Sequence, residues 1–73
     1  MYIQSQDGQT MINFDNFHAL CVNDTMLCAI KYQADRKVNV VLGTYDTHEE
    51  AIEEFESIME DMMDEGESIL EVD

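Results

Sequence analysis

The chain has 73 residues and carries 17 acidic side chains against three Lys and Arg residues, which gives a formal net charge of −14. A chain of this length forms one domain and buries only about 60% of its unfolded surface, which excludes a multidomain enzyme or a large buried active site. The shortage of cations also argues against a protein that itself binds nucleic acid or an anionic membrane.

The composition is that of a folded acidic protein rather than a disordered acidic tail. Hydrophobic residues make up 45% of the chain and proline is absent. The first residues contain neither the basic nor the apolar segment of a signal peptide, so a cytoplasmic protein is expected. Cys21 and Cys28 are then expected to be reduced thiols that serve as small core side chains, in preference to a redox or disulfide role. The two cysteines together with the two distant histidines, His18 and His48, do not have the spacing of a zinc site.

The first 45 residues are predicted to form strands joined by polar turns. Strands are expected at residues 2–4, 10–13, 17–22, 26–33 and 38–43. Turns are expected at Asp7-Gly8, Asp15-Asn16, Asn23-Asp24-Thr25 and Ala34-Asp35-Arg36-Lys37. An even-length loop before the strand at residues 26–33 would place Cys21 opposite Cys28, and an odd-length loop would not.

A single helix is predicted after the strands. Thr47 followed by Glu50 matches a capping box at the helix start, and Gly66 stands where a C-terminal cap is expected, which gives about eighteen helical residues. One apolar stripe, expected to pack across the sheet and supply most of the core, contains Ala51, Ile52, Phe55, Ile58, Met59, Met62 and Met63. Ile69, Leu70 and Val72 are expected to form a short final strand or a tucked tail.

The predicted fold class is therefore α+β, in one domain over residues 1–73. We expect a small antiparallel sheet of three to five strands, connected as a meander, packed against one amphipathic C-terminal helix.

The charge is concentrated in the second part of the chain. Residues 1–45 contain four acids against all three Lys and Arg residues, whereas residues 46–73 contain thirteen acids and no Lys or Arg. Opposite the apolar stripe, acids three or four residues apart form a first row of Glu49, Glu53, Glu56, Glu60, Asp64 and Glu67. A second row consists of Glu50, Glu54, Asp61 and Glu65.

These ten acids are the candidate partner-binding residues. Neighbouring members of a row lie roughly 5–6 Å apart on a helix, a spacing comparable with that of phosphates along a nucleic-acid strand. One interpretation is a nucleic-acid mimic that occupies the basic groove of another protein. The other is a solvated helix face that keeps a small protein soluble.

No catalytic constellation is recognisable. His18 and Cys21 are three residues apart on a predicted strand and therefore lie on opposite faces. Catalytic serine, zinc-protease and phosphate-loop motifs are missing, so neither an enzyme nor a cofactor is expected. At most, loose cation binding is expected at Asp61, Asp64 and Glu65.

Two segments resemble a group of short, largely uncharacterised bacterial and phage proteins. Residues 1–7 and 12–16 resemble its M-[FY]-I-x-S-Q-[DN] start and the following hydrophobic-N-[LF]-[DE]-N turn. Residues 41–51 resemble its L-G-x-Y-x-[ST]-x-E-x-A junction between the last strand and the helix. The resemblance implies a β-meander followed by a helix, in a bacterial host cytosol, and assigns no catalytic residue. The acidic load after Glu49 and the extension past Met63 depart from the group's pattern.

Small acidic phage-type proteins also resemble anti-CRISPR and other anti-defence inhibitors, some of which are similar to DNA in charge layout. The expected function is accordingly an inhibitor that binds a basic nucleic-acid-binding protein, such as a CRISPR effector nuclease. The alternative is a structural or regulatory protein that forms a homodimer or binds a partner through exposed apolar surface, such as Met59, Met62 and Met63 or a free sheet edge.

Overall fold

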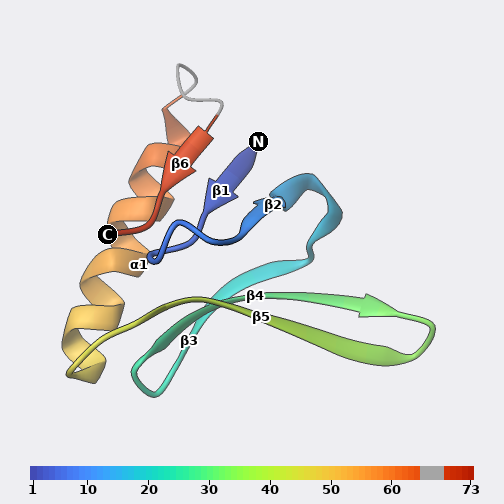
Figure 1. The fold of residues 1–73 in the computed structure, drawn as a ribbon, viewed down its shortest axis with the longest axis horizontal. Helices are drawn as coiled ribbons and strands as arrows, with labels where there is room; N and C mark the ends of the chain where they lie inside the picture. Colours follow the sequence, from blue (N-terminus) through green and yellow to red (C-terminus); the bar gives the residue numbers. More distant parts are fainter. Residues whose placement is uncertain (65–68) are drawn as a thin grey trace.

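The computed structural model describes residues 1–64 and 69–73, and in these residues the chain forms six strands, one short 3-10 helix and one α-helix (Figure 1). In chain order the elements are β1 (Tyr2–Gln4), β2 (Met11–Asn13), η1 (Phe14–Asn16), β3 (Ala19–Asn23), β4 (Met26–Gln33), β5 (Arg36–Thr44), α1 (His48–Met63) and β6 (Ile69–Glu71). The predicted α+β class is confirmed. The strands form two sheets of three instead of the single sheet expected, and β6 follows the helix.

The first sheet joins segments from both ends of the described chain, in the order β2-β1-β6 (Figure 1). β2 runs antiparallel to β1 and β6 runs parallel to it, so that Ile3 has Ile12 on one side and Leu70 on the other. All three side chains are buried on the same face of the sheet. The tail predicted from Ile69, Leu70 and Val72 is therefore a strand, and the Val72 N–H extends the pairing by donating to the Gln4 carbonyl at 3.0 Å.

The second sheet is an antiparallel meander in the order β3-β4-β5. Its first turn contains two residues, Asp24 and Thr25, because Asn23 pairs with Met26 instead of belonging to the loop as predicted. The second turn is also shorter than predicted: residues 34 and 35 form it, both at positive φ, and Arg36 already pairs with Gln33. Positive φ at both central positions matches the twist of the flanking strands, which is why two residues suffice.

The length of the first turn, two residues, determines whether the two cysteines are paired across β3 and β4. Cys21 lies directly opposite Cys28, as the even-length alternative requires. On the other side of β4 the pairing slips by one residue: Leu27 pairs with Gly43 and Cys28 pairs with Val41. Leu42 is thus the extra residue of a β-bulge, and it is fully buried. The bulge turns the Leu42 side chain into the core.

Most of the core comes from the strands, which corrects the expectation that the helix stripe supplies it. Buried side chains of both sheets form one cluster with Ile58 of α1, and they are Ile3, Ile12, Leu27, Ala29, Leu42, Leu70 and Val72. From the helix, Ala51 is also buried, and Phe55 and Met62 pack against the cluster. Met59 and Met63 are exposed. A helix resting on one side of two short sheets presents to them only the narrow part of its apolar surface.

The loop between β1 and β2 connects the two sheets. The Gln6 N–H donates to the Leu42 carbonyl at 2.7 Å, and the Gln6 side-chain oxygen accepts from the Thr44 N–H at 2.9 Å. These bonds satisfy part of the open edge of β5. Among the described residues, no helix has both the length and the apolar character required to cross a membrane.

Candidate functional site

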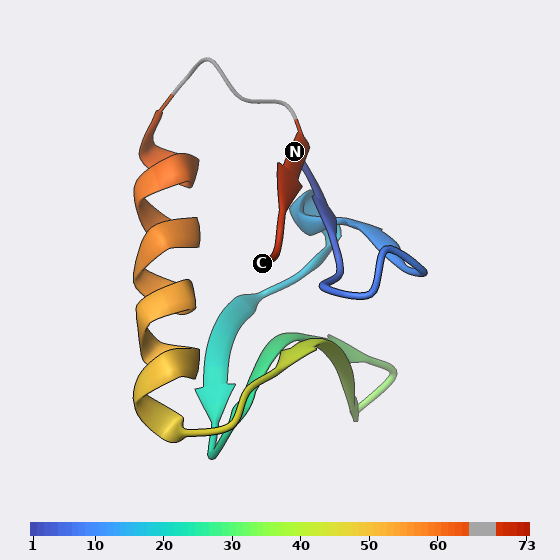
Figure 2. The same cartoon turned by 60° about the vertical axis from the view of Figure 1, so that its left-hand side comes forward.

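The acidic helix begins where its sequence predicts. Thr47 is the N-cap, in an extended conformation, and its Oγ1 accepts from the Glu50 N–H at 3.1 Å. His48 Nδ1 lies 2.6 Å from the Asp24 carbonyl, which can only accept, so this nitrogen carries the proton. The first turn of α1 is thereby fixed to the turn between β3 and β4, and Figure 2 shows the helix running upward from this point along one side of the molecule.

The first acidic row faces directly away from the core. With 3.6 residues per turn, Glu49, Glu53, Glu56 and Glu60 fall within about 60° of one another and about 180° from Ala51 and Ile58. The structure places all four acids on the surface and buries both apolar residues. From Glu49 to Glu60 the row is about 16 Å long, at 1.5 Å per residue. The structure thus brings together four of the six carboxylates assigned to this row.

Glu49, Glu53, Glu56 and Glu60 carry charges that are not neutralised by ion pairs within the part of the chain that the structure describes. None of these four carboxylates pairs with a Lys or Arg side chain in those residues. Adjacent members of the row therefore repel one another without compensation, which destabilises the helix by a few tenths of a kcal/mol for each pair.

The second acidic row is not one continuous surface. Glu50 and Asp61 are exposed, but Glu54 is half-buried, and its Oε2 accepts from the backbone N–H of Asp73 at 2.7 Å. Burial is the main cause that raises the pKa of Glu54, and the Asp73 N–H opposes the rise. Glu54 therefore holds the segment after β6 against the helix and is not available to a partner in the way that the first row is.

Tyr45 holds the same segment from the other side. Its hydroxyl donates to the Asp73 carbonyl at 2.7 Å, and the Gln6 side chain donates to that carbonyl at 3.3 Å. Burial, together with the nearby Glu54 and Asp73 carboxylates, raises the pKa of Tyr45 to about 12. Tyr45 thus remains a neutral donor at any physiological pH.

The remaining predicted acids lie at or beyond the end of the helix. The helix has 16 residues and ends at Met63, with Asp64 as its C-cap, which is shorter than the eighteen predicted. Glu65 and Glu67, like the predicted cap Gly66, lie outside the described residues. In the described residues no group of three His, Cys, Asp or Glu side chains is arranged to hold a metal ion.

An exposed apolar flank adjoins the first acidic row. Met59 is 44% exposed and Met63 is 82% exposed. On the helix they lie within about 40° of Ile52, between the buried side and the first row. Met62, which was predicted to share this role, packs against the core. A partner that covers the acidic row would also meet Met59 and Met63.

The three cations lie far from this helix. Arg36 and Lys37 begin β5 and Lys31 lies near the end of β4. In both views the turn that joins β4 and β5 lies on the opposite side of the molecule from α1 (Figures 1 and 2). The Lys31 ammonium also stands 5.2 Å from the centre of the Phe17 ring, a cation–π contact.

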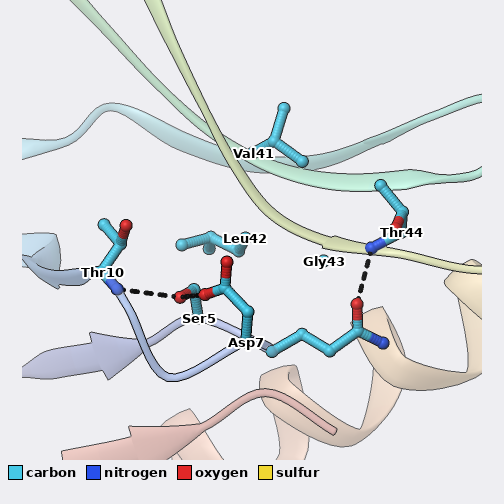
Figure 3. A pocket seen from close by; sticks show the side chains of 8 residues that line it. Ser5, Asp7, Thr10, Val41, Leu42, Gly43 and Thr44 are labelled. Atoms are coloured by element: carbon cyan, nitrogen blue, oxygen red, sulfur yellow. Dashed lines mark hydrogen bonds between the residues drawn. The ribbon is translucent and has the colours of Figure 1, made fainter.

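A small pocket between the β1–β2 loop and β5 contains a polar cluster (Figure 3). The pocket has a volume of about 170 Å³. The Ser5 hydroxyl donates to Asp7 at 2.6 Å and accepts from the Thr10 N–H at 3.1 Å. The bond from Ser5, with a further one from the Gln9 N–H, lowers the pKa of Asp7. The Ser5 hydroxyl and the Asp7 carboxylate thus both serve to close the loop around Gly8, whose φ is +72°. Apart from the Asp-Gly turn, no sequence pattern signals this cluster.

The exposure of Met59 and Met63 agrees with the apolar surface expected from the sequence. One further feature of the site escaped prediction. The anchoring role of Glu54 depends on the position of Asp73, nineteen residues away, and no local pattern signals it. Comparison of the chain with family models, with curated proteins and with solved structures gives no match.

Proposed function

We propose that this protein is an inhibitor that imitates nucleic acid and occupies the basic groove of a nucleic-acid-binding protein with the first row of α1. The observation that carries the proposal is the set of Glu49, Glu53, Glu56 and Glu60. They are exposed, aligned opposite the core and free of cationic partners in the described chain.

The dimensions of the row suit a short stretch of nucleic acid. Its length of about 16 Å corresponds to roughly five phosphates along one DNA strand, at 3.4 Å per phosphate. A groove whose Lys and Arg side chains are spaced for phosphates would therefore meet carboxylates at a similar density. Capture by such a groove also relieves the uncompensated repulsion along the helix, since the partner supplies the missing cations.

The partner class follows from this chemistry. It is a protein that binds DNA or RNA through a basic groove, and the resemblance to small acidic phage inhibitors suggests a CRISPR effector nuclease. The protein itself is not proposed to bind nucleic acid, because its three cations cannot offset 17 acids.

The test is a binding assay with a guide-loaded CRISPR effector nuclease across a range of salt concentrations. The row variant carries Glu53→Lys, Glu56→Lys and Glu60→Lys. Its matched control carries Asp15→Lys, Asp46→Lys and Glu71→Lys, which change the net charge equally at exposed positions outside the row.

Wild-type binding is expected to weaken steeply as salt rises. The row variant is expected to bind at least about 100-fold more weakly than the control, because like charges across an interface cost several kcal/mol. Equal affinity of the two variants would show that bulk charge, and not the row, governs binding.

A second candidate function is favoured by the exposure of Met59 and Met63. In this alternative the protein associates with a second copy through the apolar flank, and its charge serves solubility. Sedimentation velocity distinguishes the two functions: a dimer that dissociates on Met59→Gln and Met63→Gln substitution supports the alternative. A strict monomer at high concentration contradicts it.

A further inference from the structure

The two cysteines face each other across β3 and β4, on the sheet face that points away from the helix. Cys21 and Cys28 are direct partners in the antiparallel pairing. Leu27 and Ala29, on either side of Cys28 in β4, belong to the core cluster with Ile58. Because side chains alternate along a strand, Cys28 points to the opposite face, and Cys21 points the same way as its partner.

Their separation suits a covalent bond. Directly opposed residues in an antiparallel pair have Cα atoms about 4.5–5.5 Å apart. Disulfides form across Cα separations of about 4.4–6.8 Å. The pairing of β3 with β4 therefore places the two Cα atoms at a separation that a disulfide can bridge.

The two thiols differ in their surroundings. Cys28 is fully buried, whereas Cys21 is partly exposed. Burial and the neighbouring Cys21 raise the pKa of Cys28, partly offset by a hydrogen bond with the Asn39 side chain. Cys21 is thus the sulfur that an oxidant in solution reaches, and Cys28 is held beside it as a protected thiol.

We propose that Cys21 and Cys28 form a redox pair that closes an intramolecular disulfide between β3 and β4 on reaction with hydrogen peroxide. The Cys21 thiolate attacks one peroxide oxygen, the O–O bond breaks, and Cys21 becomes a sulfenic acid while hydroxide takes up a proton as water. The Cys28 sulfur then attacks the Cys21 sulfur. The S–S bond forms, the S–O bond breaks, and the departing hydroxide takes the Cys28 proton as a second water.

The chain offers a clean assay for this bond, because Asp24 lies between the two cysteines. Cleavage before aspartates places Cys21 in a peptide of residues 15–23 and Cys28 in a peptide of residues 24–34. After treatment of the folded protein with stoichiometric hydrogen peroxide, these two peptides are expected to be joined. The intact mass of the joined pair should lie about 2 Da below the sum of the two free peptides.

Thiol counting provides a second readout that methionine oxidation does not affect. Maleimide labelling under denaturing conditions is expected to fall from two thiols to none after peroxide, and to return to two after dithiothreitol. Cys21→Ser is the matched control at the partly exposed position. It should retain its single Cys28 thiol after the same treatment, because burial keeps the oxidant from that sulfur.

Three results would overturn the proposal. The first is oxidation of Cys21 to a sulfinic acid while Cys28 remains a free thiol. The second is a disulfide between two copies of the chain, seen on a non-reducing gel, and the third is that both thiols remain unreacted after peroxide treatment. The pair lies on the face away from α1, so these results are independent of whether the acidic row binds a partner.

Discussion

Glu53 is the position at which the uncompensated charge of the helix is most costly. Three other acids lie one turn away from it: Glu49, Glu50 and Glu56. Each like-charge pair at this spacing destabilises a helix by about 0.2–0.5 kcal/mol. Glu53→Gln removes three such pairs with almost no change in helix propensity or size. It should therefore raise the free energy of unfolding by about 0.6–1.5 kcal/mol at low ionic strength.

The assay is urea denaturation followed by circular dichroism, in 10 mM and in 1 M NaCl. At 1 M salt the screening length is about 3 Å, so the gain should nearly vanish. Glu71→Gln changes the net charge equally outside the helix and should stabilise the protein less. If Glu53→Gln gives no gain in stability at low salt, or a gain that salt does not reduce, then repulsion within the row does not destabilise the helix.

Three further changes test the fold. Gly43→Ala places a Cβ 2.8 Å from the Tyr45 hydroxyl. The unfolding free energy should fall by about 2–4 kcal/mol, because the site is overpacked and the hydrogen bond from Tyr45 to Asp73 is lost. In a Tyr45→Phe background the same substitution should lower the unfolding free energy by less. Burial disfavours the ionised form of Glu54 and raises its pKa in the folded protein. The free energy of unfolding of Glu54→Gln should therefore increase relative to that of the wild type as pH rises from the ordinary carboxyl pKa through the raised pKa of Glu54. Parallel pH profiles of the two unfolding free energies would contradict this. Ala34→Gly should retain the hairpin and stabilise the protein by up to about 1 kcal/mol in thermal melts, because Ala34 has a φ of +52°, which glycine adopts without strain. A decrease in thermal stability would show that the backbone at Ala34 is not strained.

The features that local sequence determines were predicted well. The bounds of β1 and β4 agree with the structure, and the Thr47 cap stands where the capping box places it. Each depends on residues within one turn or one strand. The outward direction of Glu49, Glu53, Glu56 and Glu60 was also predictable, because it follows from the helical period and the positions of the apolar residues.

The features that were missed depend on contacts between distant segments or on backbone conformations that the residue type disfavours. Ala34 at positive φ is uncommon for a residue with a Cβ, so a four-residue loop was the natural prediction for this turn. The parallel pairing of β1 with β6 has no local signal in the sequence, and neither has the division of the strands into two sheets. For the same reason Glu54 was grouped with the binding acids, although it anchors Asp73.

The placement of the three cations on the hairpin opposite α1 has a consequence for how the molecule approaches another one. Negative charge at one side and positive charge at the other give the protein a permanent electric dipole in addition to its net charge of −14. In the field of a positively charged surface such a molecule experiences a torque that turns α1 toward the surface before contact. Fewer encounters are then lost to the wrong orientation, and the gain is greatest within about one screening length of the surface, because salt removes most of the field beyond that distance.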